Sequence, residues 1–340
     1  MESGAATSTN CPIAASARAG ASAPKLDRRA IENIVRSGKR LLVQGAMGIH
    51  ASDGLAGKVA AMESPRLIGV GTISAVVKSE QLLRAEIRRA RADAPSGFIG
   101  MNLMAAINRA DFDSALRIAF EEGISFIVQG AGISRDVVKQ CRDAGVPFAG
   151  IVSSGRLAKM YEKWGAEFLV AEGAEAGGHI GDIGHPLPAL LADVLAHSSL
   201  PTIAAGGIDA EDLPAIFGAG AAGAQLATRF LACSEGDSHL NFKQMHLAKR
   251  DADVTLITSC VKGMKARAVR NTFTDALLAA AIKGDTENGL FYTGQSVTRI
   301  PEQSAQALPT VAEIFELFED VLDAAESTAG IARAAGAARG

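Results

Sequence analysis

The sequence predicts an α/β protein built on a closed (β/α)8 TIM barrel, with a smaller, mainly helical cap inserted after the eighth strand. Eight short apolar runs recur between residues 41 and 226, and segments with helical spacing and a charged face separate them. Glycine closes several of these segments just before the next run. Eight such units are typical of a barrel. An open doubly wound sheet is the alternative, but no G-x-G-x-x-G follows an early strand.

The composition indicates a globular protein with a large core. The 340 residues are 48% hydrophobic and 21% charged. A formal net charge of −3 leaves no basic excess, which argues against nucleic acid as a partner. Four cysteines without a C-x-x-C pair indicate free thiols in a reducing cytoplasm. No apolar stretch is long enough to span a membrane or to form a signal peptide, so we expect a cytoplasmic protein without a membrane partner.

The chain is expected to begin with a tail and a short helix. Residues 1–24 are rich in Ala, Ser, Gly and Thr and predict disorder, because they have little to bury. Residues 27–37 predict a helix. The barrel is expected to take residues 25–232 and 307–326. Its strands are expected at residues 41–43, 67–70, 98–101, 126–128, 148–152, 168–170, 201–205 and 222–226.

Helices are expected between these strands. Ser134 is a typical N-cap residue, and Asp136 adds a carboxylate to the first turn of the same helix. The helices are expected at residues 79–92, 111–122, 134–144, 156–164 and 209–217. The glycines expected to close them with a positive φ are Gly123, Gly145, Gly165 and either Gly218 or Gly220.

Three segments follow the eighth strand. Residues 233–306 are more polar, show no clear strand pattern and predict a helical cap or substrate domain. Residues 310–325 carry a strong apolar stripe at helical spacing and predict the last helix of the barrel. Residues 327–340 are rich in Ala and Gly and predict a flexible tail.

Chemistry is expected where residues 168–181 leave the barrel. Residues 168–171 predict a buried strand, and the chain then turns into glycines, two carboxylates and one histidine. Gly177 and Gly178 allow positive φ and a close approach of backbone to a ligand. His179 follows them, and an unperturbed histidine has a pKa of roughly 6.5. Barrels place their active sites at such strand ends.

His179 has three interpretations. It could be a hydrogen-bonded structural residue, a metal ligand together with Asp182 and His185, or a general acid or base. The metal interpretation lacks a recognised ligand motif, and the position at a strand end favours catalysis. We therefore expect His179 to be catalytic and expect no metal.

Other strand ends carry glycines or amide side chains. Residues 44–48 form either a plain turn or a backbone loop that lies against a flat ring. Asn102 is as well explained by a satisfied turn as by a ligand contact. Gln129 precedes glycines at a helix N-terminus, which favours anions. Residues 205–208 and 225–228 end strands 7 and 8, where barrels recurrently bind phosphate.

Taken in order, these segments resemble the nitronate monooxygenase (2-nitropropane dioxygenase-like) family, a relative of the FMN-dependent enoyl-acyl-carrier-protein reductases. The resemblance covers about residues 40–322, and Glu-Ala-Gly-Gly-His at 175–179 is its most specific part. The segments that carry it are residues 44–48, 100–104, 130–132, 151–154, 172–179, 204–208 and 225–230, extended by 238–243, 268–271 and 294–296.

The resemblance implies an FMN-binding barrel without a metal, in which His179 is catalytic. The cofactor-binding residues that it implies are Ala46, Met47, Gly48, Asn102 and Gln129 at the flavin, Gly177 and Gly178 from strand 6, and Gly206, Gly207, Gln225, Ala227 and Thr228 at the phosphate, with Glu172 and Leu226 beside them. Three positions depart from the family pattern. Residues 63–69 lack its Gly-Gly-x-Gly, Ala227 stands where glycine is usual, and Gln129 stands where a small hydroxyl residue is common.

The implied reaction is the FMN-dependent oxidation of an alkyl nitronate by O2 to a carbonyl compound and nitrite. The expected partners are a small-molecule substrate and either O2 or NAD(P)H, and the sequence allows a homodimer. The alternatives are an NAD(P)H-dependent enoyl-thioester reductase, a flavin oxidase that acts on a specialised metabolite, and a flavin-binding barrel without turnover. A flavin-free lyase fits less well, since no lysine paired with carboxylates stands at the strand ends.

Overall fold

A closed barrel of eight parallel strands forms the centre of the molecule, in the order β1-β2-β3-β4-β5-β6-β8-β9. The computed structural model describes residues 23–48, 53–76, 78–104, 109–130, 132–180, 184–248, 254–258, 265–269, 293–300 and 308–337. All eight predicted runs form barrel strands, which confirms the predicted fold. The strands are β1 (Arg40–Gln44), β2 (Leu67–Ser74), β3 (Phe98–Met104), β4 (Phe126–Gly130), β5 (Phe148–Val152), β6 (Phe168–Glu172), β8 (Thr202–Ala205) and β9 (Gly223–Leu226).

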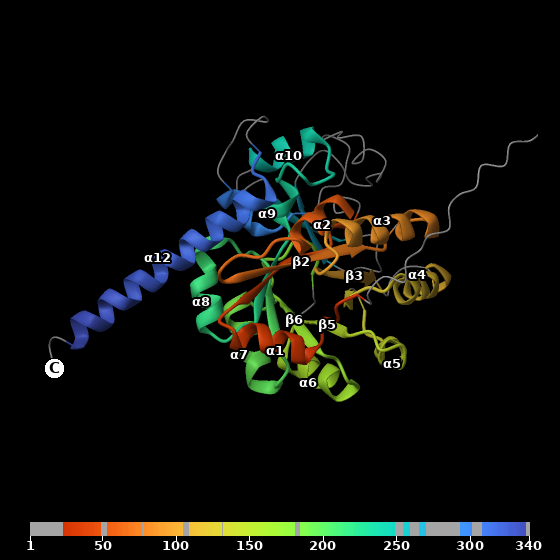
Figure 1. The fold of residues 1–340 in the computed structure, drawn as a ribbon, viewed down its shortest axis with the longest axis horizontal. Coiled ribbons are helices and arrows are strands. Elements are labelled where there is room, and N and C mark those ends of the chain that lie inside the picture. The colour runs from red at the N-terminus through yellow and green to blue at the C-terminus, as the bar shows by residue number, and fades with distance from the viewer. Residues whose placement is uncertain are drawn as a thin grey trace, which may run out of the picture.

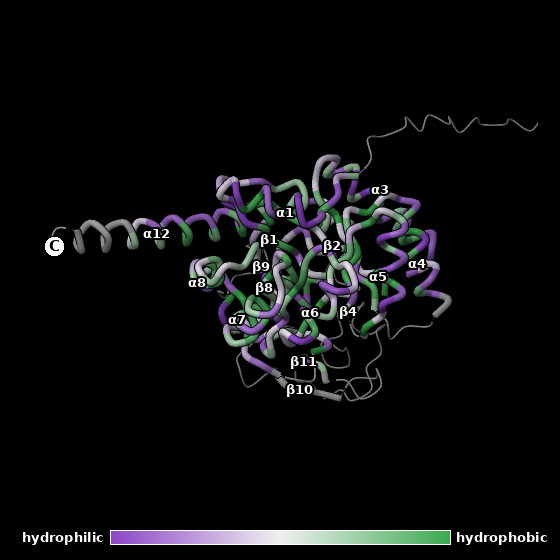
Figure 2. Tube along the Cα trace, turned by 90° about the horizontal axis from the view of Figure 1, so that it is seen from below, coloured by the Kyte–Doolittle hydropathy of each residue, from purple (hydrophilic) through white to green (hydrophobic). Residues whose placement is uncertain are grey.

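Helices surround this barrel, as Figures 1 and 2 show. Ser134 caps its helix as predicted, because its hydroxyl accepts a hydrogen bond from Val137 N–H at 3.4 Å. The predicted helix-closing glycines Gly123, Gly145 and Gly165 have positive φ, and of the last pair it is Gly220 that does. The helices are α1 (Arg28–Arg36), α2 (Asp53–Ala60), α3 (Glu80–Asp93), α4 (Arg109–Glu122), α5 (Arg135–Asp143), α6 (Gly155–Trp164), α7 (Leu187–His197), η2 (Ala210–Asp212), α8 (Leu213–Gly218), α9 (Thr228–Leu231), α10 (Leu240–Leu247), η4 (Gln295–Arg299) and α12 (Val311–Ala337).

The sequence did not predict α2, α7 or the four-residue helix α9. In α2, two glycines interrupt an eight-residue helix, so its periodicity is weak. In α7, apolar residues occupy most positions, so no charged face marks it as a helix. The approach of α2 to the barrel depends on Gly71, because a Cβ there would lie 2.0 Å from Ala56 O.

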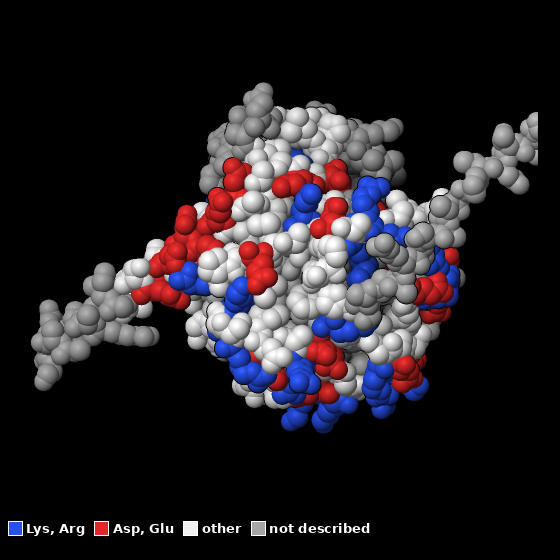
Figure 3. Space-filling model, in the orientation of Figure 1, with Lys and Arg blue, Asp and Glu red and all other residues white. Residues whose placement is uncertain are grey.

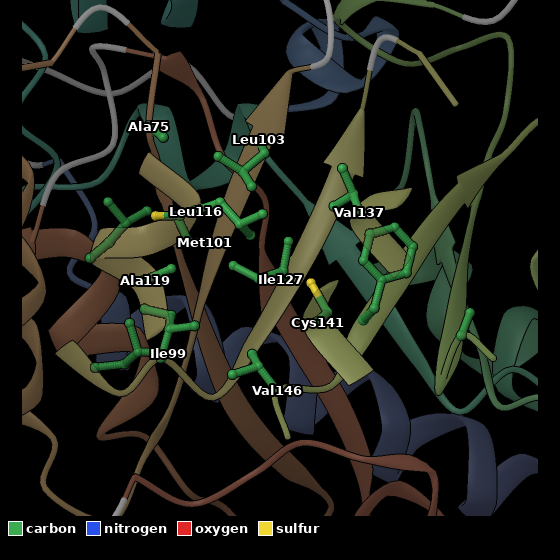
Figure 4. Packing of buried hydrophobic residues seen from close by; sticks show 14 of the residues in the cluster. Ala75, Ile99, Met101, Leu103, Leu116, Ala119, Ile127, Val137, Cys141 and Val146 are labelled. Atoms are coloured by element: carbon green, nitrogen blue, oxygen red, sulfur yellow. The ribbon is translucent and has the colours of Figure 1, made fainter. Parts of the chain in front are cut away.

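The core has an inner and an outer layer, because successive residues of a strand point to opposite faces. Inside the barrel, Val128 and Val170 belong to one buried cluster. Outside it, Met101 and Ile127 pack with Cys141 of α5 in a second cluster, which Figure 4 shows from close by. The alternation places Glu172, two residues after Val170, on the inner face at the carboxyl end of β6.

A small antiparallel sheet adjoins the barrel. Its strands are β7 (Gly178–His179), β10 (Val254–Thr258) and β11 (Lys265–Val269), in the order β10-β11-β7. This hairpin corrects the expectation that residues 233–306 contain no clear strand. The period-2 pattern of two five-residue strands is too short to stand out from a polar segment. Much of this expected cap lies outside the described residues, so its predicted helical character stays a prediction.

The chain ends in a longer helix than the sequence predicts. Figure 1 shows α12 leaving the body of the molecule and continuing to Ala337, where a flexible tail was expected from residue 327. Alanine has the highest helix propensity, and this segment is rich in alanine, which favours the helical extension. The expected N-terminal tail falls largely on residues 1–22, which lie outside the described part, as do Cys11 and Cys260.

On the face shown in Figure 3, Lys and Arg lie interspersed with Asp and Glu and form no continuous basic patch. Of the helices in the described ranges, none has the length and apolar character needed to cross a bilayer.

Candidate functional site

A cavity opens at the carboxyl ends of β1, β6, β8 and β9. About 490 Å³ of space lies between its walls, part of it continuous with solvent. Most of the predicted cofactor-binding residues line it, namely Ala46, Glu172, Gly177, Gly206, Gly207 and residues 225–228. The sequence did not assign a role to two further lining residues, Gly294 and Ser296, although both lie in a segment that carried the family resemblance.

The floor of the cavity follows from the strand register. Glu172 of β6 pairs with Ala205 of β8, and Ala205 pairs with Gln225 of β9. These three residues form one row on the inner face, in which the small Ala205 leaves room between two longer polar side chains. Next to β9, a Cβ at Gly45 would lie 3.2 Å from the Gln225 side chain, so this glycine makes space for the amide.

Glu172 is an unusual carboxyl group for a strand end. Its side chain is partly exposed and lines the cavity. Burial raises the pKa of Glu172 to about 7, because the protein around the cavity solvates an ionised carboxylate poorly. The group is therefore close to half protonated at neutral pH.

The turn after β8 can be built only with glycine. Gly206 and Gly207 have φ values of 101° and 66°, which side chains rarely adopt. A Cβ at Gly206 would lie 3.0 Å from Gly173 O, and a Cβ at Gly207 would lie 2.5 Å from Glu175 Cβ. No side chain therefore covers the backbone of this turn on its cavity side. Such an uncovered backbone is required where a phosphate accepts hydrogen bonds from backbone N–H groups.

Two arginines lie behind this turn, and both are paired with carboxylates. Arg229 and Asp209 form a buried, two-point ion pair, with Nε to Oδ1 at 3.1 Å. Arg299 contacts Asp212 at 2.7 Å and also donates to Gly207 O. These ion pairs hold the turn and the residues that follow it, and neither guanidinium lines the cavity.

A loop of residues 173–179, called here the His179 loop, forms another wall. Arg267 of β11 donates to Ala176 O at 3.0 Å through Nε and to Ala174 O at 2.7 Å through Nη2. His179 itself pairs with Ala266 in the small sheet. Gly177 lies against the chain that precedes η4, because a Cβ there would lie 2.3 Å from the carbonyl carbon of Thr293.

The segment with η4 closes the cavity by hydrogen bonds to two walls. Gly294 N–H donates to Thr228 Oγ1 at 3.0 Å, and Gln295 N–H donates to Glu175 O at 3.0 Å. The Thr228 hydroxyl, predicted from the sequence to bind phosphate, thus accepts a backbone hydrogen bond in the structure. Its own proton remains available as a donor.

His179 is half-buried in β7, and burial lowers its pKa, so the imidazole is mostly neutral at neutral pH. It is not among the described residues that line the cavity, and its catalytic role stays a prediction. No group of three or more His, Cys, Asp or Glu side chains suited to a metal occurs in the described ranges. Asp182, one of the metal ligands considered, lies outside them.

Five predicted cofactor contacts do not line the cavity, and they stay predictions. Asn102 is on the inner face of β3, with Nδ2 3.6 Å from the position of a Cβ on Gly130. Gln129 follows the inward-facing Val128 along β4, so its side chain points outward to the helices. Gln129 is 1% exposed, and its side-chain amide atoms have no hydrogen-bond partner among the described residues. Met47 packs between two apolar clusters. The others are Gly48, which has positive φ and open space around its Cβ position, and Gly178 of β7.

Comparison with known proteins gives a consistent family. The sequence model of a family described as nitronate monooxygenase matches residues 33–286. The chain is 34% identical over 148 residues to a probable nitronate monooxygenase of Bacillus subtilis, which covers 41% of this chain and 42% of that protein. It is 28% identical over 212 residues to a (3aS,4S,5R,7aS)-5-hydroxy-7a-methyl-1-oxo-octahydro-1H-indene-4-carboxyl-CoA dehydrogenase of Mycobacterium tuberculosis, which covers 62% of this chain and 58% of that protein.

These alignments thus span about half the length of the curated relatives. The fold extends the likeness further. A solved structure of a FabK point mutant from Thermotoga maritima superposes with a TM-score of 0.76 and 27% identity, over 89% of this chain and 98% of that one.

Proposed function

The chain belongs to the nitronate monooxygenase family, and from this premise we propose that it is an FMN-dependent oxidoreductase that oxidises an alkyl nitronate with O2 to a carbonyl compound and nitrite. The observation that carries the proposal is the cavity built from the turns after β8 and β9, whose glycine backbone leaves space where a Cβ would clash. One such pair of turns suits the single phosphate of FMN.

The residues that hold the cofactor act through backbone and neutral side chains. Gly206 and Gly207 present their backbone to the phosphate, with the Thr228 hydroxyl beside them. Gln225 offers an amide donor and acceptor to polar edges of the ligand. Bound FMN supplies the electron transfer between substrate and O2.

The catalytic role proposed for His179 is to handle a proton. Because burial lowers its pKa, His179 is mostly neutral at neutral pH and can accept the α-proton of a neutral nitroalkane at a ring nitrogen. A nitronate anion has already lost this proton, so there the imidazole orients the substrate instead. Arg267 holds the loop that carries His179 through two backbone carbonyls.

The test begins with the visible spectrum of the purified protein and of the protein after FMN is added. We expect a flavin spectrum that a nitronate bleaches in the absence of O2 and that recovers when O2 is admitted, with nitrite as a product. Protein that stays colourless after addition of FMN would contradict the proposal. The variant His179→Asn separates cofactor binding from catalysis, since it should retain the flavin spectrum and lose turnover of nitroalkanes.

A second candidate is an oxidoreductase that acts on an acyl thioester. The observation that favours it is the relative from Mycobacterium tuberculosis, which is named as a dehydrogenase of a carboxyl-CoA compound. Bleaching by NAD(P)H without O2, followed by recovery with an enoyl thioester, would support this function. Bleaching by nitronate without any nicotinamide supports the first.

A further inference from the structure

Among the described residues, those that line the cavity proposed for FMN include an acid and no basic side chain. Glu172 is the one titratable side chain among the described residues that line it. From neighbouring elements, the small or neutral residues Ala205, Gln225 and Gly45 face the same space, together with Ala46, Ala176, Gly177, Gly294 and Ser296. The anionic ligand and the carboxyl group therefore share one cavity.

Four charged groups near the cavity, in the part of the chain that the structure describes, have other partners. Arg229 is paired with Asp209, and Arg299 is paired with Asp212. Arg267 donates to two carbonyls of the His179 loop. The carboxylate of Glu175 accepts Leu187 N–H at the start of α7. None of these four groups lines the cavity.

An ionised Glu172 opposes the binding of a phosphate monoester. Such a phosphate carries about −1.5 to −2 charges at neutral pH. In a cavity walled by protein, the repulsion between this group and a carboxylate is much stronger than in water. A protonated Glu172 removes the repulsion and adds an O–H donor to the site.

We propose that Glu172 takes up a proton when FMN binds, so that the affinity for FMN is coupled to pH through this one side chain. The inference rests on the proposed function, because FMN is taken as the ligand, and it assigns to Glu172 a role that the family resemblance does not. Since burial raises the pKa of Glu172 to about 7, roughly half of the free protein must take up the proton at neutral pH. At higher pH nearly every molecule must do so.

The test is a calorimetric titration of FMN into flavin-free protein, in two buffers with different heats of ionisation, from about pH 6.5 to pH 8.5. The difference between the buffers gives the number of protons taken up per FMN. For the wild type we expect uptake that approaches one proton as the pH rises, with affinity falling by up to about tenfold per pH unit above pH 7. The variant Glu172→Gln should show neither effect.

Two controls isolate the cause. Glu167→Gln removes a carboxylate that lies just before β6, at the end of the strand opposite to Glu172. There Glu167 accepts a hydrogen bond from Arg28 N–H. This variant should leave proton uptake unchanged. Riboflavin lacks the phosphate, so its binding to the wild type should take up no proton; this arm does not depend on any variant.

Each adverse result has a distinct meaning. Proton uptake by Glu172→Gln equal to that of the wild type, or equal uptake with riboflavin and FMN, would overturn the inference while leaving FMN as the cofactor. If FMN fails to bind the wild type at every pH, both the proposed cofactor and this inference are wrong.

Discussion

Glu172 of β6 and Gln225 of β9 lie in one row across the inner face of the barrel, with only Ala205 of β8 between them. An acid and an amide thus flank a methyl group at the floor of the cavity. A longer residue at position 205 would fill the gap, and a charged one would be buried beside Glu172. The strand register therefore determines both the shape and the polarity of the proposed cofactor site.

The glycine turn after β8 gives the first prediction. Gly206→Ala should abolish FMN binding, because the added Cβ meets Gly173 O at 3.0 Å and Ala176 N at 3.2 Å. Gly220→Ala is a matched control: its φ of 104° is close to the 101° of Gly206, but its Cβ would meet only Leu195 Cδ1 at 3.7 Å. Gly220→Ala should lose about 1–2 kcal/mol of stability from backbone strain, and Gly206→Ala should lose more, because its Cβ also meets Gly173 O.

Thermal unfolding and flavin fluorescence distinguish the two effects. The expected outcome is two folded variants that are both less stable than the wild type, of which only Gly220→Ala retains FMN. If Gly206→Ala binds FMN as the wild type does, the turn does not hold the phosphate.

The barrel could be predicted from the sequence because its signals are local. Each strand is a short apolar run, and Ser134 and Gly165 mark helix ends through their own side-chain chemistry or backbone freedom. The cavity turns could be found for the same reason, since glycines after strands 7 and 8 are visible in the chain. Prediction was weakest for α7, in which apolar residues obscure the helical period.

Contacts between distant segments could not be predicted from the sequence. Arg267 lies more than ninety residues from Ala174 along the chain, and no local pattern links the two. The same is true of Gly294 and Thr228, which are joined by one hydrogen bond across the cavity. These contacts depend on how the segment after β9 folds back over the barrel, which the spacing of residues does not encode.

Arg267 gives the second prediction. Arg267→Met removes two charge-assisted hydrogen bonds to the His179 loop, each worth about 1.5–3 kcal/mol when its acceptor is left buried. We expect FMN to bind at least tenfold more weakly, because Ala176 and Gly177 form part of the cavity wall. The dissociation rate of FMN, followed by fluorescence, measures this directly.

A second variant tests whether the loss is one of positioning. Added guanidinium at low millimolar concentration should partly restore FMN affinity to Arg267→Ala, whereas it should not rescue a variant that is merely unstable. Arg117→Met is the control, because Arg117 is an exposed residue on α4 that pairs with Glu80 and Glu121. Unchanged FMN dissociation in Arg267→Met would rule out a role for this guanidinium in the cavity wall.

The carboxyl group of Glu172 gives the third prediction, for stability in the absence of FMN. Its folded-state pKa of about 7 lies above the ordinary value of 4.5, so its contribution to stability is complete below about pH 4.5 and is lost as the pH rises to about 7. Glu172→Gln avoids this loss. It should be more stable than the wild type at pH 8, by at most about 3 kcal/mol and by less where cavity water solvates the carboxylate.

Denaturant unfolding of flavin-free protein at about pH 4.5 and about pH 8 provides the measurement. The stability difference between variant and wild type should appear only at the higher pH. A difference that is the same at both values would mean that Glu172 titrates normally.

His179 gives the fourth prediction, a pH dependence that differs between two substrates. Because burial lowers the pKa of His179, the acid limb of kcat/KM for a neutral nitroalkane should lie below about pH 6.5, where the imidazole becomes protonated and can no longer accept the α-proton. A preformed nitronate needs no deprotonation, so its profile should lack this limb. FMN must be kept saturating at each pH, so that loss of cofactor does not imitate the effect.

His179→Asn should lower nitroalkane turnover by about 100-fold or more and should remove the acid limb. His197→Asn is the control, because His197 is an exposed histidine that pairs with Asp193, and it should change neither property. Equal acid limbs for the two substrates would show that another group abstracts the proton.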